Sequence, residues 1–133
     1  MTRAVMLPVA YVSAEPTPVA EVAHTDTART EDVHVSHYWP PLGGTNCSRF
    51  VNGECISRMA GGERWQDHID SAAACPPDWV FGTMFVTPDG RRWVCMDRGG
   101  RIVYGPDGLV WVDLLTEAPG YRYGEVVTIE FED

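Results

Sequence analysis

Turn-forming residues divide the chain from Val33 onward into short apolar segments, and this division limits the fold more than any other feature of the sequence. Two pairs of such segments flank Pro-Asp-Gly turns, namely residues 83–87 with 92–96 and residues 101–104 with 109–115. Short runs rich in β-branched and aromatic residues around such turns are typical of β-hairpins. The sequence therefore predicts a mainly β domain that contains two hairpins.

Two further strands are expected at residues 33–38 and 126–131, which brings the expected number to six. The only helical candidate is the segment 62–73, where Trp65, Ile69 and Ala72 or Ala73 would share one face. A length of 133 residues, with 44% of them apolar, suits one domain with a packed core. Six short strands and one short helix predict a compact closed barrel.

The first 32 residues differ in composition from the rest, because they are rich in small residues, threonine and proline and contain no cysteine. We expect residues 1–32 to form an extended N-terminal arm or linker and residues 33–133 to form the barrel domain. Residues 4–12 are apolar and β-prone. They could be a signal remnant, a disordered tail, or an ordered arm that adds a strand to a second copy of the chain and so forms a homo-oligomer.

Four cysteines, an even number, lie at positions 47, 55, 75 and 95 without any Cys-x-x-Cys spacing. This pattern favours two disulfides over a zinc site. Cys47 and Cys55 flank the turn-forming Asn52-Gly53, so we expect them to pair, which leaves Cys75 to pair with Cys95.

The alternatives to this pairing are four reduced core cysteines and a metal site. Zinc would need ligands from the scattered His24, His34, His37 and His68. We expect neither a metal nor another cofactor. Two disulfides would place the protein in an oxidising compartment, outside the cell.

Charge and hydropathy exclude two classes of partner. Nineteen acidic residues against ten basic ones give a net charge of −9, which makes nucleic acid an unsuitable partner. No apolar run reaches the 18 residues that a membrane-spanning helix needs, so we expect no membrane span.

Two carboxylates stand in apolar segments, where an acid is costly to bury. Asp97 ends the run Trp93-Val94-Cys95-Met96, and Asp113 lies between Val112 and Leu114. Each acid alone could simply cap backbone amides at a strand end. Together, two carboxylates from neighbouring strands in one cleft could have different pKa values, so that one stays protonated near neutral pH.

Four segments in order along the chain resemble the three-aspartate ("3D") domain: residues 74–83, 95–102, 111–114 and 123–127. The most specific part is the Asp-x-Gly-Gly-x-Ile box at residues 97–102. The resemblance covers about residues 34–131 and implies a six-stranded double-psi β-barrel. The family includes the barrel domain of membrane-bound lytic transglycosylase A, and it is more distantly similar to expansins and rare lipoprotein A.

The resemblance implies an exported protein that acts on the glycan strand of peptidoglycan or on another polysaccharide. Asp113 matches the acid that protonates the glycosidic oxygen in lytic transglycosylases and then takes a proton from the C6 hydroxyl. Asp97 would orient the substrate or tune Asp113. Two departures from the family pattern bear on activity. Cys75 stands where the family has its first aspartate, and the hairpin between Asp97 and Asp113 is longer than usual.

Further substrate contacts are expected from glycines and aromatic rings. Gly99 and Gly100 would let the backbone approach the sugar closely. Trp93, Trp111 and Tyr104 could stack on pyranose rings, although aromatic rings on strands are often core residues. The alternatives to an enzyme are an inert barrel of the same fold and an extracellular structural subunit that assembles into a filament or lattice through its arm.

Overall fold

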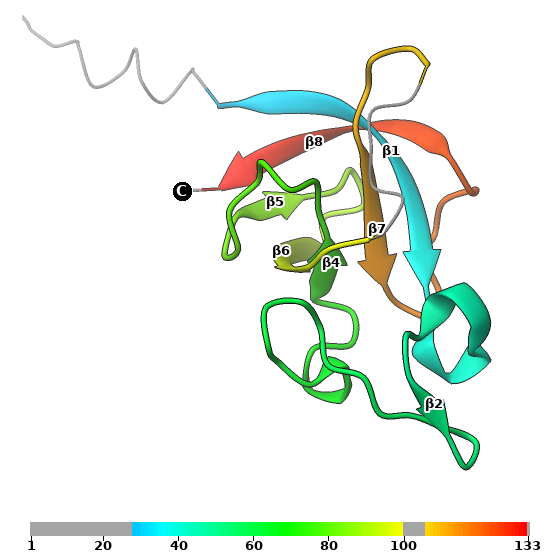
Figure 1. The fold of residues 1–133 in the computed structure, drawn as a ribbon. Coiled ribbons are helices and arrows are strands. Elements are labelled where there is room, and N and C mark those ends of the chain that lie inside the picture. The colour runs from blue at the N-terminus through cyan, green and yellow to red at the C-terminus, as the bar shows by residue number, and fades with distance from the viewer. Residues whose placement is uncertain (1–27, 100–105, 133) are drawn as a thin grey trace, which may run out of the picture.

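The computed structural model describes residues 28–99 and 106–132, and six strands of this part of the chain form a closed barrel (Figure 1). These strands are β1 (Thr30–Tyr38), β4 (Ala72–Ala74), β5 (Met84–Val86), β6 (Arg92–Asp97), β7 (Trp111–Leu115) and β8 (Glu125–Glu132). Their order around the barrel is β1-β7-β4-β6-β5-β8, and β8 pairs with β1 to close it. The pairs β1–β7 and β4–β6 are parallel, and the other four are antiparallel. The predicted six-stranded closed barrel is confirmed.

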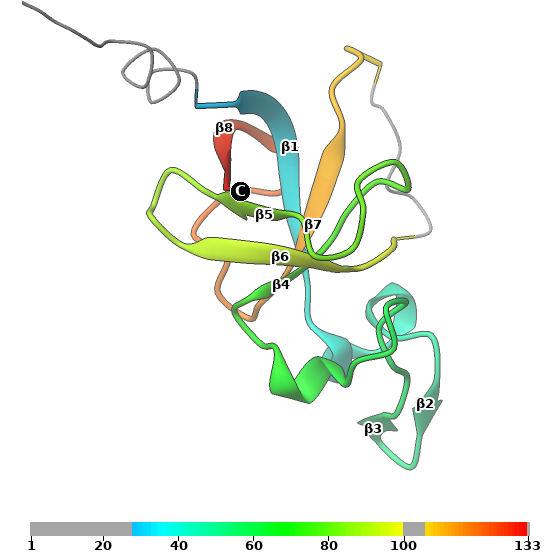
Figure 2. The ribbon, with the colours of Figure 1, turned by 90° about the vertical axis from the view of Figure 1, so that its left-hand side faces the viewer.

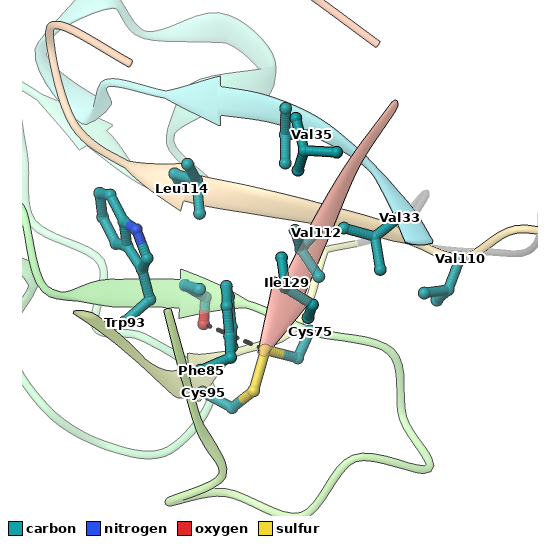
Figure 3. Close-up of a cluster of buried hydrophobic side chains, with 12 residues drawn as sticks. Val33, Val35, Cys75, Phe85, Trp93, Cys95, Val110, Val112, Leu114 and Ile129 are labelled. Atoms are coloured by element: carbon teal, nitrogen blue, oxygen red, sulfur yellow. Dashed lines mark hydrogen bonds between the residues drawn. A yellow bond between two sulfur atoms is a disulfide. The ribbon is translucent and has the colours of Figure 1, made fainter. Parts of the chain in front are cut away.

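Alternation along the strands directs one set of side chains into the barrel. Val33 and Val35 on β1, like Val112 and Leu114 on β7, are at most 1% exposed. The residues between them face outward, as the period of two in a β-strand requires. Figure 3 shows the inward set around Phe85 and the Cys75–Cys95 disulfide.

Both predicted disulfides are confirmed. Cys75 and Cys95 form one inside the barrel, where neither is exposed. Cys47 and Cys55 form the other outside the barrel, next to the short hairpin of β2 (Phe50–Val51) and β3 (Glu54–Cys55). Two disulfides indicate an oxidising, extracellular environment.

The hairpin predicted around Pro88-Asp89-Gly90 is confirmed as β5 and β6, which pair antiparallel. Gly90 occupies the left-handed region of the turn, with φ at +89°. The second predicted hairpin is not tested, because residues 101–104 lie outside the described residues. Its later strand, β7, begins at Trp111 and pairs with β1 and β4.

The first strand starts earlier than expected, since β1 begins at Thr30, three residues before the predicted boundary at Val33. Residues 1–27 of the predicted arm, including residues 4–12, lie outside the described residues. The last strand, predicted at 126–131, is confirmed as β8.

The predicted helix at residues 62–73 is wrong. The segment contains a 3₁₀ turn, η3 (Trp65–Asp67), and Ala72 and Ala73 belong to β4. Asp70 has a φ of +66°, which no α-helix allows, and Ala72 to Ala74 are at most 2% exposed because side chains pack against both faces of β4. Pairing with β6 and β7 therefore overrides the high helix propensity of alanine. No helix in residues 28–99 or 106–132 is long and apolar enough to cross a membrane.

The chain between β1 and β4 leaves the barrel and lies at one end of it, below the strands in both ribbon views (Figures 1 and 2). This outer segment, residues 39–71, contains η1 (Pro40–Leu42), η2 (Gly44–Asn46), the β2–β3 hairpin and η3. Trp65 packs with Cys55, Met59 and Leu115 in a second buried cluster. The outer segment is thus anchored on the outward-facing residues of the barrel wall.

Candidate functional site

Asp113 and Asp97 lie in one row across the barrel wall. Ser36 on β1 pairs with Asp113 on β7, Asp113 pairs with Ala74 on β4, and Ala74 pairs with Asp97 on β6. Neighbouring strands are about 4.8 Å apart, so the backbones of the two acids are roughly 10 Å apart. Ala74 lies between the two acids in this row, and the Tyr38 hydroxyl, which donates to Asp97, borders the same pocket.

A β-bulge places Asp97 in this row. Ala73 pairs with Cys95, but the next residue, Ala74, pairs with Asp97, so the register skips Met96. A bulge changes the direction in which the side chains after it point. Cys95 faces the core, Met96 packs against the second buried cluster, and Asp97 lines the pocket described next.

Both acids line one open pocket of about 270 Å³, between the barrel wall and the outer segment. The barrel contributes Tyr38, Ala74, Asp97 and Asp113. The opposite wall comes from residues 44–48, residues 57–59 and Trp65 of the outer segment. The volume of the pocket lies just below the usual range of small-molecule sites, about 300–1,000 Å³.

Asp97 is held by three hydrogen bonds. Its Oδ1 accepts from the backbone amides of Ala60 and Arg98, both at 2.8 Å, and its Oδ2 accepts from the Tyr38 hydroxyl at 2.9 Å. A carboxylate that only accepts hydrogen bonds is in its charged form. Asp97 therefore fixes the outer segment to β6 and presents a negative charge in the pocket.

Asp113 has a different environment, because its side chain accepts one hydrogen bond, from the Ser36 hydroxyl to Oδ1 at 3.0 Å. Burial raises the pKa of Asp113 from 3.8 to about 6, the Ser36 bond lowers it, and the charge of Asp97 raises it. A carboxyl group with a pKa near 6 can give and take a proton close to neutral pH. Asp113 is therefore the acid of the pair whose pKa is raised.

Tyr38 connects the two acids and keeps its proton. Burial, followed by the charge of Asp97, raises the pKa of its hydroxyl well above the usual range. Its hydroxyl therefore stays protonated at neutral pH and donates to Asp97. Arg58 and Arg98 also line the pocket. The guanidinium of Arg98 makes two contacts with residues outside the pocket lining: its Nη2 donates to the Trp79 carbonyl at 2.7 Å, and the group stacks on Phe81.

The structure brings some of the predicted substrate-binding residues to the pocket but not others. Gly99 lines it. Gly100 and Tyr104 lie outside the described residues. Trp111 lies outside the pocket and stacks on His34. Trp93 is fully buried in the barrel core, where its Nε1 donates to Thr87, so it has no face free for a sugar.

Sequence reasoning missed Ser36 and Tyr38 and the whole outer wall. The two residues alternate with the buried Val33 and Val35, so the period of the strand already placed them on the outward face. Nothing in the pattern showed that this face would border Asp113. The outer wall has no regular period, because it consists of turns and a two-residue hairpin.

No group of three or more metal-binding side chains comes together within residues 28–99 and 106–132. All four cysteines are in disulfides. The polar side chains that line the pocket are those of Asp97, Asp113, Tyr38, Arg58 and Arg98, together with Thr45, Asn46, Ser48 and Ser57.

Comparison of the chain with protein-family models, with curated proteins and with solved structures finds no match in any of the three.

Proposed function

We propose that the protein is an exported, peptidoglycan-directed barrel that cleaves the glycan strand in the manner of a lytic transglycosylase. One observation carries this proposal: Asp113, with a pKa of about 6, shares an open pocket with the charged Asp97. An acid that is protonated near neutral pH next to a fixed negative charge suits the cleavage of a glycosidic bond.

In the proposed reaction, Asp113 acts twice. Its carboxylic acid gives a proton to the glycosidic oxygen, and the bond from that oxygen to C1 breaks. The resulting carboxylate takes the proton of the C6 hydroxyl on the same sugar, whose oxygen then bonds to C1. The products are a 1,6-anhydro sugar and a new hydroxyl end, no water is consumed, and Asp113 is protonated again.

The other pocket residues support this step. The negative charge of Asp97 keeps the pKa of Asp113 raised and favours the positive charge that develops at C1. Ser36 holds Oδ1 of Asp113 in place. Ala74, which lies between the two acids in the row, also lines the pocket.

The proposal includes the three-aspartate family and its double-psi barrel, because the motifs around both acids match that family in order. Cys75, at the position of the missing first aspartate, is buried in the core in a disulfide. The reaction above needs one proton-transferring acid, so the loss of that carboxylate leaves it possible. Two disulfides are consistent with a place in the cell wall, outside the cytoplasm.

The test is incubation of the purified protein with purified peptidoglycan between about pH 5 and 7, with mass spectrometry of the released products. The wild-type protein is expected to release anhydro-muropeptides. Asp113→Asn, which keeps the Ser36 bond but has no acid proton, is expected to release none. Asp67→Asn is the matched control, since its side chain is 57% exposed and lies outside the pocket.

The Asp97→Asn variant tests the effect of Asp97 on the pKa of Asp113 separately from proton transfer by Asp113. It is expected to lower the pKa of Asp113 and to move the basic limb of the pH–activity profile to lower pH. No anhydro product from the wild-type protein at any pH, or equal release by Asp113→Asn, would overturn the proposal.

A further inference from the structure

We infer that Trp111 and Tyr123 form a second glycan subsite, which binds the sugars on the side of Asp113 opposite the pocket. This inference rests on the proposed function and adds to it the direction in which the strand lies. We call Trp111, Tyr123, His34 and Val126 the aromatic platform.

The register of the barrel places the platform beside the acid. Trp111 and Asp113 are two residues apart on β7, so both face outward, and their backbones are about 6.7 Å apart. His34 and Ser36 are the corresponding pair on β1, opposite Trp111 and Asp113. Tyr38, which lines the pocket, pairs with Leu115, so the pocket extends from Asp113 toward the other end of β7. Asp113 therefore lies between the pocket and the platform.

The platform continues across the neighbouring strand and is open to solvent. Val126 of β8 pairs with His34, which in turn pairs with Trp111, so the three form one outward row next to the row of the acids. Val126 is 48% exposed and Tyr123 is 76% exposed. Tyr123 and Val126 therefore present apolar surface to solvent next to Trp111 and His34.

The rings are held in place before any ligand binds. Trp111 stacks on His34 with centroids 4.9 Å apart, and Tyr123 meets Trp111 edge-on at 5.4 Å. Gly124 allows this approach, because a Cβ at that position would be 3.1 Å from the Trp111 ring. Its φ of +78° also favours glycine.

His34 is the positioning residue beneath Trp111. Its Nδ1 lies 2.8 Å from the Gly124 carbonyl and its Nε2 lies 2.8 Å from the Asp107 carboxylate. Both partners accept hydrogen bonds, so both contacts are hydrogen bonds together only when both ring nitrogens carry a proton, and they raise the pKa of His34. In this protonated form, the positive charge of the His34 ring attracts the electron-rich face of Trp111, and the two hydrogen bonds fix the plane of the His34 ring.

A sugar strand fits this surface better than a peptide or a lipid. The C–H face of a pyranose is flat and apolar and matches an exposed aromatic ring, while its hydroxyls need polar groups at the rim. Asp107, with a side chain 47% exposed, and Arg122, with a side chain 90% exposed, provide such a rim. The distance from Asp113 to Trp111 corresponds to a neighbouring sugar of the strand whose bond Asp113 would cleave.

The test measures binding without turnover, in the Asp113→Asn background. The Asp113→Asn protein is sedimented with insoluble purified peptidoglycan, and the bound fraction gives the affinity. Adding Tyr123→Ala is expected to weaken binding roughly two- to tenfold, the usual effect of one aromatic contact. Adding Tyr123→Phe, which keeps the ring, is expected to restore most of the affinity.

Val80→Ala is the matched control, since Val80 is 71% exposed and lines neither the pocket nor the platform. Equal affinity of the Tyr123→Ala and Val80→Ala proteins, or no binding of peptidoglycan at all, would overturn the platform. Failure of the proposed reaction has a different signature, because binding that depends on Tyr123 without any anhydro product would retain the platform and remove the enzyme.

Discussion

Replacing Asp113 with asparagine should make the protein more stable at neutral pH, although it should abolish the proposed activity. Folding buries the Asp113 carboxyl and raises its pKa from 3.8 to about 6. At pH values between 3.8 and about 6, Asp113 is protonated in the folded protein but ionised in the unfolded chain. The free energy of unfolding therefore falls as the pH rises from about 4 to about 6, and it stays lower above that range.

The magnitude follows from the difference of about two pKa units. At 1.36 kcal/mol per unit, ionised Asp113 costs about 3 kcal/mol at pH 7.5 and only about 0.5 kcal/mol at pH 4. Asparagine has nearly the same shape, and its Oδ1 can accept the same hydrogen bond from Ser36. Asp113→Asn should therefore raise the free energy of unfolding by about 2 to 3 kcal/mol near pH 7.5 and much less near pH 4.

The assay is urea unfolding of both proteins at these two pH values, followed by tryptophan fluorescence. Asp67→Asn serves again as the control and should change the stability by less than about 0.5 kcal/mol at either pH. A stabilisation that is equal at both pH values would refute the reasoning, because only the titration of Asp113 makes it depend on pH. A destabilisation near pH 7.5 would show that the charged carboxylate has a partner that asparagine cannot replace.

Two further predictions concern His34 and the disulfides. The hydrogen bond to the Gly124 carbonyl raises the pKa of His34 above 6.5, burial lowers it by a smaller amount, and Asp107 raises it further. The stability that protonated His34 contributes is therefore complete below pH 6.5 and is lost as the pH rises through the raised pKa. His34→Gln should therefore remove part of the fall in wild-type stability above pH 6.5 in urea unfolding, and an unchanged pH dependence would contradict the imidazolium. Replacing Cys75 and Cys95 with alanine should cost about 3.3 kcal/mol, and replacing Cys47 and Cys55 about 2.5 kcal/mol, because the first bridge spans 20 residues and the second spans 8. A larger cost for the outer bridge in the same unfolding assay would contradict this ranking.

The parts of the fold that could be predicted are those with a local signal. The hairpin at β5 and β6 follows from its turn, and the disulfides follow from the spacing of the cysteines. The alternation of Val33 and Val35 with polar residues correctly indicated a strand with one face in the core. Each of these depends on residues close together in the chain.

The parts that could not be predicted depend on contacts between distant segments. Ala72 to Ala74 look helical by propensity, and only the pairing of β4 with β6 and β7 makes them a strand. The pocket wall is formed by turns of the outer segment, which have no hydrophobic period to detect. The sequence singled out both acids, but their shared pocket depends on strand order, which no local pattern encodes.

The Cys75–Cys95 disulfide and the positions of Asp97 and Asp113 depend on the same register between β4 and β6. The bridge joins Cys75, directly after β4, to Cys95 of β6 on the core side, where the register between the two strands skips Met96. On the outer side the same slip puts Asp97 opposite Ala74, and the Cys75 amide donates to the Asp97 carbonyl at 3.0 Å. A one-residue change of register would turn Asp97 toward the other face of the strand. The bridge therefore fixes covalently the register that brings Asp97 and Asp113 together.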